Sequence, residues 1–376
     1  MAEPRLVDLA ELKPRLLRTF DHYSSRFGTL IDHHPDYFPI YTRDGRWRHS
    51  GELWTDWCSG FLTGIMWHCY RRIRHDWWRE KAEHYCRLIE HKKHDRDVHD
   101  LGFIFLNSYL PWYEVTGDED KKQVVITAGQ TLAKRFREKG QYLCSFIGPE
   151  SLFIDIMMNV PIIFYAARET GDEELLRVAR AHCRTTERTI VRPDGGTAHE
   201  GIFDTNTGEF LRESTHQGRS GDSDWTRGLA WSLYGFGTAY TYSKDEADLA
   251  VAERNAGHFI ERCPEGLVAP WDFDAPEGDR IADSSASAIA ASGLWQLADL
   301  SPDPARAARY QDAALTILDA LCTEQFVSWN DPQWEGVLKH GVYHKAKGLG
   351  VDESVMWGEF FLLEAVSKAL TLIDAD

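Results

Sequence analysis

Two kinds of helix alternate along this chain of 376 residues, and the alternation restricts the possible folds more than any other feature. One kind is amphipathic and charged, and it follows short turns such as TGDEDKKQVVITA (116–128) and TGDEELLRVARAH (170–182). The other kind is apolar and poor in Lys and Glu, as in IDIMMNVPIIFYAA (154–167) and SSASAIAASGLWQLA (284–298). Because a helix that is apolar all round is buried, whereas an amphipathic helix lies at a surface, the pattern indicates an inner and an outer layer.

The hydrophobic periodicity predicts twelve helices in six pairs. They cover approximately residues 8–26, 57–74, 77–92, 101–116, 119–138, 152–169, 172–189, 225–241, 244–261, 283–299, 304–324 and 353–372. Six inner and six outer helices close into an all-α (α/α)6 barrel, which we expect to form one catalytic domain over residues 1–376. Strand signals are sparse, but segment 190–225 predicts a small β-hairpin with DTNTGEF as its turn.

The connections between the helices differ at the two ends of this barrel. Short turns with Ser, Asp or Gly before acidic residues or Pro follow the inner helices, and they provide N-caps for the outer helices. Longer loops rich in Gly, Trp and His precede the inner helices. The N-termini of the inner helices therefore meet at one face, where the helix dipoles favour anionic ligands.

Composition argues against several classes of partner and location. The net charge of −17 disfavours nucleic acid and anionic membrane surfaces. No segment approaches the roughly 20 apolar residues of a membrane span, and MAEPRLVDLAELKPRLL is typical of a helix rather than a signal peptide. Seven Cys without a CxxC motif are typical of buried thiols in a reduced protein. We therefore expect a cytoplasmic protein that is a monomer or a weak homodimer.

Aromatic residues are abundant, with fourteen Trp beside fourteen Tyr. Many of the Trp lie in polar, loop-like stretches, such as GELWTDWCSG, SDWTRGLAWS, APWDFDAP and SWNDPQWEG. Flat aromatic faces in a polar cleft suit sugar rings, whereas core packing explains any single Trp equally well. The set as a whole favours a carbohydrate ligand.

Polar residues cluster where the inner helices begin: Asp100, Asp155, Arg227, Asp283, Ser284, Ser285, Asp352 and Glu353. Asp155 has no Lys or Arg within seven residues and lies in an apolar stretch, and a buried carboxylate without a partner shifts its pKa. Asp100 and Asp155, as neighbours, cannot both ionise easily, so we expect one raised pKa and acid–base chemistry, with Asp155 in the driest setting. The alternative is that either Asp is only a helix N-cap.

Motifs of several other chemistries are missing from the sequence. No GxGxxG opens a helix after a predicted strand, and there is neither a Walker loop nor a GxSxG elbow. The run HKKHDRDVHD (91–100) contains His and Asp, but its spacing matches no closed zinc site. We therefore expect neither a metal nor a cofactor.

Five motifs together resemble the unsaturated glucuronyl hydrolases of glycoside hydrolase family 88. They are HDLGF, IDIMMNVP, HQG with SDWTRGLAWSLYG, PWDFDAP with DSSASAIAASGL, and GVLKHGVYH with GVDESVMWGEFFLLEAV. They occur in this order from about residue 50 to the C-terminus. The resemblance implies an (α/α)6 barrel, which the helix pattern indicates independently.

The resemblance also implies an activity. Such enzymes act on oligosaccharides that polysaccharide lyases leave with a 4,5-unsaturated uronic acid at the non-reducing end. They hydrate the C4=C5 double bond, and the resulting hemiketal rearranges and releases the remaining sugar. Asp155 matches the general acid/base of the family, and Asp100 matches its second essential carboxylate. The expected substrate contacts are Trp54, His99, His199, Gln217, Trp225, Arg227, Trp231, Lys339 and His340.

Some of these residues carry more detailed expectations. Arg227 offers a bidentate fork for a carboxylate or sulfate. Trp225 and Trp231 are six residues apart and so do not share a helix face, which predicts that one stacks on the sugar and the other packs. The loop 338–354 is expected to face the next sugar, and its lysines contact sulfate or only solvent. The absence of a serine-rich pattern favours unsulfated or weakly sulfated substrates.

Three alternatives stay open at the level of sequence. The first is an unsaturated rhamnogalacturonyl hydrolase that acts on pectin fragments with the same fold. The second is a sugar epimerase that uses His199 with His340 or His344 as paired bases. The third is a catalytically silent carbohydrate-binding protein, against which the intact Asp100 and Asp155 argue.

Overall fold

A closed ring of inner helices forms the centre of the computed structural model, which describes residues 7–50 and 57–375. The inner elements are α2 (Ser59–Ile73), α4 (Leu101–Phe105) with α5 (Tyr109–Thr116), α7 (Pro161–Thr170), α9 (Thr226–Ser243), α11 (Ser284–Leu300) and α13 (Met356–Ala375). Each contacts the next around the ring, and α13 returns to contact α2. The sequence-based prediction of a closed barrel is therefore confirmed.

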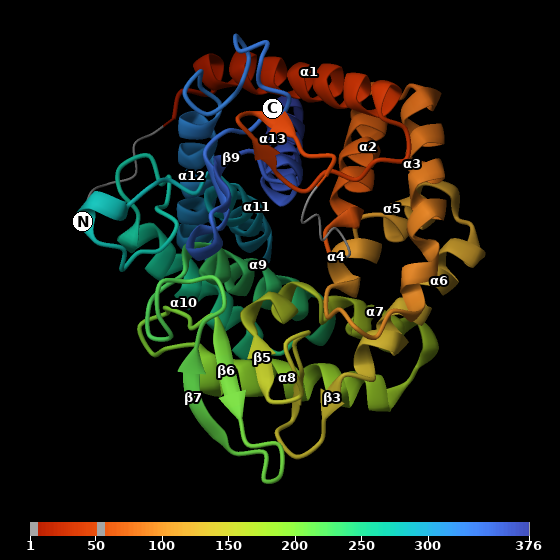
Figure 1. The fold of residues 1–376 in the computed structure, drawn as a ribbon, viewed down its shortest axis with the longest axis vertical. Helices are drawn as coiled ribbons and strands as arrows, with labels where there is room; N and C mark the ends of the chain where they lie inside the picture. Colours follow the sequence, from red (N-terminus) through yellow and green to blue (C-terminus); the bar gives the residue numbers. More distant parts are fainter. Residues whose placement is uncertain (1–6, 51–56, 376) are drawn as a thin grey trace.

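A second set of helices surrounds this ring (Figure 1). The outer helices are α1 (Leu9–His33), α3 (Asp76–Ile89), α6 (Glu119–Ala133), α8 (Glu173–Ile190), α10 (Glu246–Arg262) and α12 (Pro304–Leu321). Helix α1 packs on α13, and each of the others packs on the inner helix that precedes it. The alternation of helix types along the sequence thus corresponds to two layers.

The predicted N-caps of the outer helices are present. Asp118, Asp172, Asp245 and Asp303 each accept a hydrogen bond from a backbone N–H in the first turn of the helix that follows. Such a cap stabilises a helix by about 1 kcal/mol, because it satisfies a donor that has no partner inside the helix. The short turns therefore fix where each outer helix begins.

Two predicted helices position the site, and both differ from the structure. The expected helix 152–169 begins only at Pro161, because residues 151–153 form strand β5 (Ser151–Phe153) and the next five form the 3-10 turn η2 (Ile154–Met158). Proline suits the first position of a helix, where its missing N–H has no cost. The expected helix 101–116 is divided at Ser108, whose backbone is not helical. Pro111 explains this division, since its ring would clash with the carbonyl of Asn107 in a continuous helix.

Two β-sheets lie beside the ends of the inner helices. The predicted hairpin is confirmed as β6 (Glu200–Phe203) and β7 (Phe210–Ser214), and β5 joins β6 as a third antiparallel strand. A second hairpin, β8 (Gly341–His344) and β9 (Leu349–Glu353), was not predicted. The remaining short elements are β1 (Thr42–Arg43), β2 (Arg46–Trp47), β3 (Phe136–Arg137), β4 (Tyr142–Leu143), η1 (Glu90–His94), η3 (Glu277–Asp279) and η4 (Lys345–Lys347).

Residues from the two ends of the chain meet at one point of the ring. The backbone N–H of Thr42 donates to the carbonyl of Ser354 at 2.9 Å, and the N–H of Met356 donates to the carbonyl of Ile40 at 2.9 Å. The N–H of Ser354 donates to Oγ1 of Thr42 at 2.9 Å. These bonds fix β9 and the start of α13 against the segment that follows α1.

Two further expectations are addressed by the described residues. Six of the seven cysteines are buried, which confirms their expected burial. In the ranges 7–50 and 57–375, no helix combines the length and the hydropathy that a membrane span requires.

Candidate active site

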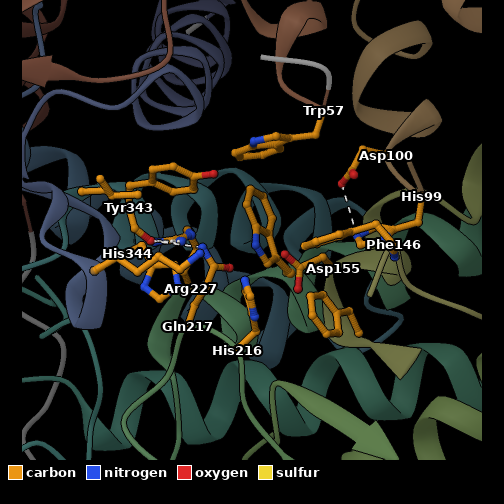
Figure 2. A pocket seen from close by; sticks show the side chains of 14 residues that line it. Trp57, His99, Asp100, Phe146, Asp155, His216, Gln217, Arg227, Tyr343 and His344 are labelled. Atoms are coloured by element: carbon orange, nitrogen blue, oxygen red, sulfur yellow. Dashed lines mark hydrogen bonds and ion pairs between the residues drawn. The ribbon is translucent and has the colours of Figure 1, made fainter. Parts of the chain in front are cut away.

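A cavity of about 260 Å³ opens where the inner helices begin. Its lining comes from loops and helix starts that are far apart in the sequence, and Figure 2 shows the labelled side chains pointing into a common space. The lining residues are Trp57, His99, Asp100, Phe146, Phe153, Asp155, His216, Gln217, Arg227, Trp231, Tyr343, His344, Lys347 and Leu349. The predicted convergence of the inner helix N-termini on one face is therefore confirmed.

Asp100 lies deep in this cavity at the start of α4. Its side chain makes no capping hydrogen bond to the helix, although it occupies the N-cap position, so the N-cap alternative is wrong. The residue is 4% exposed. Burial, followed by the nearby charge of Asp155, raises the pKa of Asp100 well above its usual range. Both effects favour the protonated form of Asp100.

Asp155 lies on η2, where β5 passes toward α7. Its side chain is 15% exposed, against 6% for Asp100, so Asp155 is the more accessible carboxylate. Burial pushes its pKa upward, but His199, then His99 and Arg227, hold the pKa below its usual value. The expectation that Asp155 has the driest setting is wrong, because Asp100 lies deeper. The expected pair of unlike carboxylates is present, with the raised pKa on Asp100.

A histidine faces each carboxylate. Nε2 of His199 lies 3.5 Å from Oδ2 of Asp155, and Nε2 of His99 lies 3.4 Å from Oδ1 of Asp100. Both histidines are 2% exposed. His99 contributes to the cavity lining, whereas His199 lies behind Asp155 and is not among the lining residues. The two predicted histidines are therefore brought to the carboxylates.

Arg227 lines the cavity but is engaged by the protein itself. Its guanidinium donates to the carbonyls of Val342 and Tyr343 and lies 3.3 Å from Oδ2 of Asp283, which is fully buried. Nε2 of Gln217 donates to the same Tyr343 carbonyl at 3.2 Å. The two side chains that were predicted to contact substrate therefore hold the β8–β9 hairpin against the barrel.

The two predicted tryptophans on α9 and at its start have different surroundings. Trp231 lines the cavity, whereas Trp225 packs between His199 and Arg227, with its ring 4.4 Å from the imidazole centroid and 4.4 Å from the guanidinium carbon. Trp54 lies outside the described residues. Trp57, three residues further along the same GELWTDWCSG stretch, lines the cavity.

Two predicted substrate contacts lie away from the cavity. Nζ of Lys339 donates to the carbonyl of Glu324 at 3.2 Å, and His340 binds Asp352 through Nδ1 at 2.6 Å. Both residues precede β8 and face the segment after α12. In this part of the chain, the residues that line the cavity come later, on β8 and after it. Lys339 and His340 are therefore not among the lining residues, and their predicted contact with substrate stays a prediction. Asp352 and Glu353 also bond elsewhere, to His340 and to Thr42.

Several lining residues were missed by sequence reasoning: Phe146, Phe153, His216 and Tyr343, with His344 and Lys347 considered only in other contexts. The unpredicted β8–β9 hairpin carries three of them. The sequence did contain a signal for it, since Gly348 supplies the left-handed backbone of a tight turn (φ 64°) after alternating residues. Neither ring nitrogen of the buried His344 has a hydrogen-bond partner among the described residues.

No group of three or more His, Cys, Asp or Glu is arranged to hold a metal ion within the described ranges. The run 91–100, which contains such residues, is divided between η1 and the loop before α4.

Residues 30–324 match the family model of Glycosyl Hydrolase Family 88. The chain belongs to glycoside hydrolase family 88. It is 35% identical over 347 residues to an unsaturated glucuronyl hydrolase of Bacillus sp. (strain GL1), covering 89% of this chain and 91% of the relative. It is 31% identical over 324 residues to an unsaturated chondroitin disaccharide hydrolase of Streptococcus pneumoniae, with 84% and 82% covered.

A solved structure agrees with these similarities. The crystal structure of the unsaturated glucuronyl hydrolase of Bacillus sp. GL1, described as responsible for the degradation of glycosaminoglycan, superposes with a TM-score of 0.88. The two are 32% identical, and the match covers 93% of this chain and 96% of the other. The family 88 chain is thus a glycoside hydrolase with an α/α barrel, and the epimerase and silent-binding alternatives are not favoured.

Proposed function

We propose that this family 88 enzyme releases the 4,5-unsaturated uronic acid from the non-reducing end of lyase-generated oligosaccharides. The names of its relatives, which include a glucuronyl and a chondroitin disaccharide hydrolase, support this substrate class. The observation that carries the proposal is the pair of unlike carboxylates in an aromatic cavity, with the pKa of Asp100 raised and that of Asp155 lowered. A proton donor and a proton acceptor are thereby available in one site.

The chemistry is the addition of water to an enol ether. A proton is added to C4 of the unsaturated ring, and the electron deficiency that develops at C5 is shared with the ring oxygen. The oxygen of a water molecule then bonds to C5 while its proton passes to a carboxylate. The resulting hemiketal opens, and the bond to the remaining sugar then breaks, which releases that sugar. Because the double bond is attacked, the usual rule that relates carboxylate separation to stereochemistry does not apply.

Asp155 is the residue that we propose exchanges protons with the substrate. Its side chain is the more accessible of the two carboxylates, with 15% exposed against 6% for Asp100. The substrate is itself anionic, so its binding raises the pKa of Asp155 by like-charge repulsion. A raised pKa lets Asp155 act as general acid, and burial raises the pKa of Asp100 as well, so we propose Asp100 as the proton reserve of the pair.

The remaining lining residues suit a sugar acid. Trp57, Trp231 and Tyr343 offer aromatic faces, which stack on the apolar faces of sugar rings. Arg227 and Lys347 supply positive charge, and His216 and His344 add polar ring nitrogens, in a molecule whose net charge is −17. The local composition of the cavity therefore supports an anionic substrate despite the net charge of the protein.

The decisive test is the ultraviolet absorbance of the conjugated C=C–carboxylate. It is followed after the protein is mixed with unsaturated disaccharides made by lyases from chondroitin, hyaluronan, heparin, gellan and pectin. We expect the absorbance to fall, and to fall at least about 100-fold more slowly with Asp155→Asn. The fastest substrate names the parent polysaccharide, and a fastest rate on pectin fragments would instead favour the rhamnogalacturonyl alternative. No loss of absorbance on any of the five would overturn the proposal.

A further inference from the structure

The surroundings of His199 determine where its ring proton lies. Nδ1 accepts hydrogen bonds from the backbone N–H groups of His216 at 3.0 Å and Gln217 at 3.1 Å. A backbone N–H donates and cannot accept, so Nδ1 carries its lone pair and no proton. A neutral imidazole then has its only proton on Nε2. The turn after β7 therefore selects the Nε2–H form of His199.

Among the described residues, one polar atom faces the proton on Nε2 of His199. Oδ2 of Asp155 lies 3.5 Å away, at the outer limit of a hydrogen bond. Both atoms are buried, and neither has a hydrogen bond to any other described residue. The ring is held between Phe153 and Trp225, with centroid separations of 4.5 Å and 4.4 Å. Such long contacts in a free enzyme tighten when substrate is bound.

His99 repeats this arrangement on a different part of the chain. Its Nδ1 accepts the backbone N–H of Phe146 at 3.1 Å, so its proton also lies on Nε2. Nε2 faces Oδ1 of Asp100 at 3.4 Å, as the dashed line in Figure 2 indicates. Burial lowers the pKa of His99 to about 3, so the ring is neutral at physiological pH. Phe146 and Phe153 pack against the ring on two sides.

We propose that His99 and His199 are positioning residues rather than substrate ligands: backbone N–H groups lock both rings as Nε2–H tautomers, and each ring aims its one N–H at one of the paired carboxylates. Each carboxylate thereby has one oxygen fixed toward a donor and the other available to the cavity. Neither imidazole serves as a base, because its only lone pair is already used. The protons of the reaction are therefore carried by the two Asp residues alone, a point that rests on the proposed function.

The tautomers are measured without any turnover. Full-length protein labelled with nitrogen-15 histidine is studied at about pH 7 by long-range proton–nitrogen correlation, which distinguishes protonated from unprotonated ring nitrogens. The signals of the two rings are assigned from their loss in His99→Gln and His199→Gln. We expect an unprotonated Nδ1 and a protonated Nε2 in both. His182, whose Nδ1 accepts the N–H of Leu143 at 3.1 Å, provides an internal reference for this pattern.

Two substitutions of His199 separate the possible roles. Glutamine places an amide N–H near the position of Nε2 and so retains a donor to Asp155. Asparagine places an oxygen near the position of Nδ1, which retains the bonds to residues 216 and 217 but removes the donor. We expect kcat to fall by less than about 10-fold in His199→Gln and by roughly 10- to 100-fold in His199→Asn, as for other residues that orient a reacting group. KM should change little in either variant.

The control is His84→Gln, because Nε2 of His84 faces Asp36 on the exposed surface far from the cavity lining. It should keep wild-type kinetics. A proton on Nδ1, or on both nitrogens, would overturn the proposal directly. Higher activity in His199→Asn than in His199→Gln would mean that His199 only holds the turn after β7 in place. A raised KM with unchanged kcat would mean that His199 binds the substrate. If no substrate is turned over, the proposed function fails while the tautomer measurement still decides this inference.

Discussion

At the scale of single residues, Arg227 shows that a residue can be assigned correctly to a site while its contacts there are not predicted. Its fixed charge and position at an inner helix start placed it at the cavity from sequence alone. We did not predict that the carbonyls of Val342 and Tyr343 occupy its fork, because we did not predict the β8–β9 hairpin. The pairing of Asp155 with Asp100 was likewise predictable from the sequence. Which of the two carboxylates lies deeper was not predictable, because depth depends on the packing around them.

We predict that Arg227→Ala destabilises the protein by about 3 to 5 kcal/mol. Asp283 would remain fully buried without its opposing charge, and that cost is typical of a broken buried ion pair. Arg227→Lys should not restore stability, because one ammonium group does not reproduce a fork that bonds two carbonyls and a carboxylate. Urea unfolding of the three proteins measures this. Wild-type stability together with a raised KM alone would instead support a direct bond from Arg227 to the substrate.

At the scale of elements, Asn159 joins the two segments that carry the carboxylates. Its Oδ1 accepts the N–H of Phe103 at 2.8 Å, in the helix that follows Asp100, and its Nδ2 donates to the carbonyl of Asp155 at 3.0 Å. The side chain is fully buried. Close contact between these segments also requires Gly102, since a Cβ there would lie 2.5 Å from Cα of Asn159.

We predict that Asn159→Ala lowers the free energy of unfolding by roughly 2 to 4 kcal/mol, because two buried backbone groups lose their partners. It should also lower kcat, since α4 and η2 are no longer held in register. Thermal or urea unfolding and the absorbance assay measure the two effects. Asn206→Ala, on the exposed turn between β6 and β7, is the matched control and should change neither. Unchanged kcat in a destabilised Asn159→Ala would mean that the carboxylates are positioned by other contacts.

The elements that sequence analysis recovered are those with local causes. Outer helices begin at Asp residues whose side chains cap them, and the β6–β7 turn has its own residue signature. The stretch 151–160 was misread as helix because its apolar residues do not alternate with polar ones. There the deciding interaction is the pairing of β5 with β6, between residues far apart in the sequence, and periodicity does not report such pairing.

At the scale of the whole molecule, a buried carboxylate on α13 makes stability depend on pH. Glu359 is fully buried and accepts the N–H groups of Val337 at 2.8 Å and Leu338 at 3.0 Å. Burial raises its pKa from 4.5 to about 7. Below pH 4.5 both the folded and the unfolded chain hold this proton. Between pH 4.5 and about 7 only the folded chain holds it, so ionisation of the unfolded chain lowers stability as pH rises.

We predict that this residue removes about 3 kcal/mol of stability between pH 4.5 and 7, from 2.5 pKa units at about 1.4 kcal/mol each. Glu359→Gln has no proton to exchange there, so the difference in unfolding free energy between wild type and variant should change by that amount across the window. Urea unfolding at several pH values measures the difference. A difference that is constant with pH would show that Glu359 does not titrate in this range.

The closure of the ring also determines when, during synthesis of the chain, the cavity becomes complete. The cavity is completed by Tyr343 and His344, on a hairpin that is fixed by bonds between the segment around Thr42 and residues that follow Val351. A ribosome synthesises both carboxylates and their histidines well before this hairpin, and a domain generally folds as a unit. A nascent chain that already carries Asp100 and Asp155 therefore has an incomplete cleft. Catalytic competence arrives only when the last inner helix joins the first.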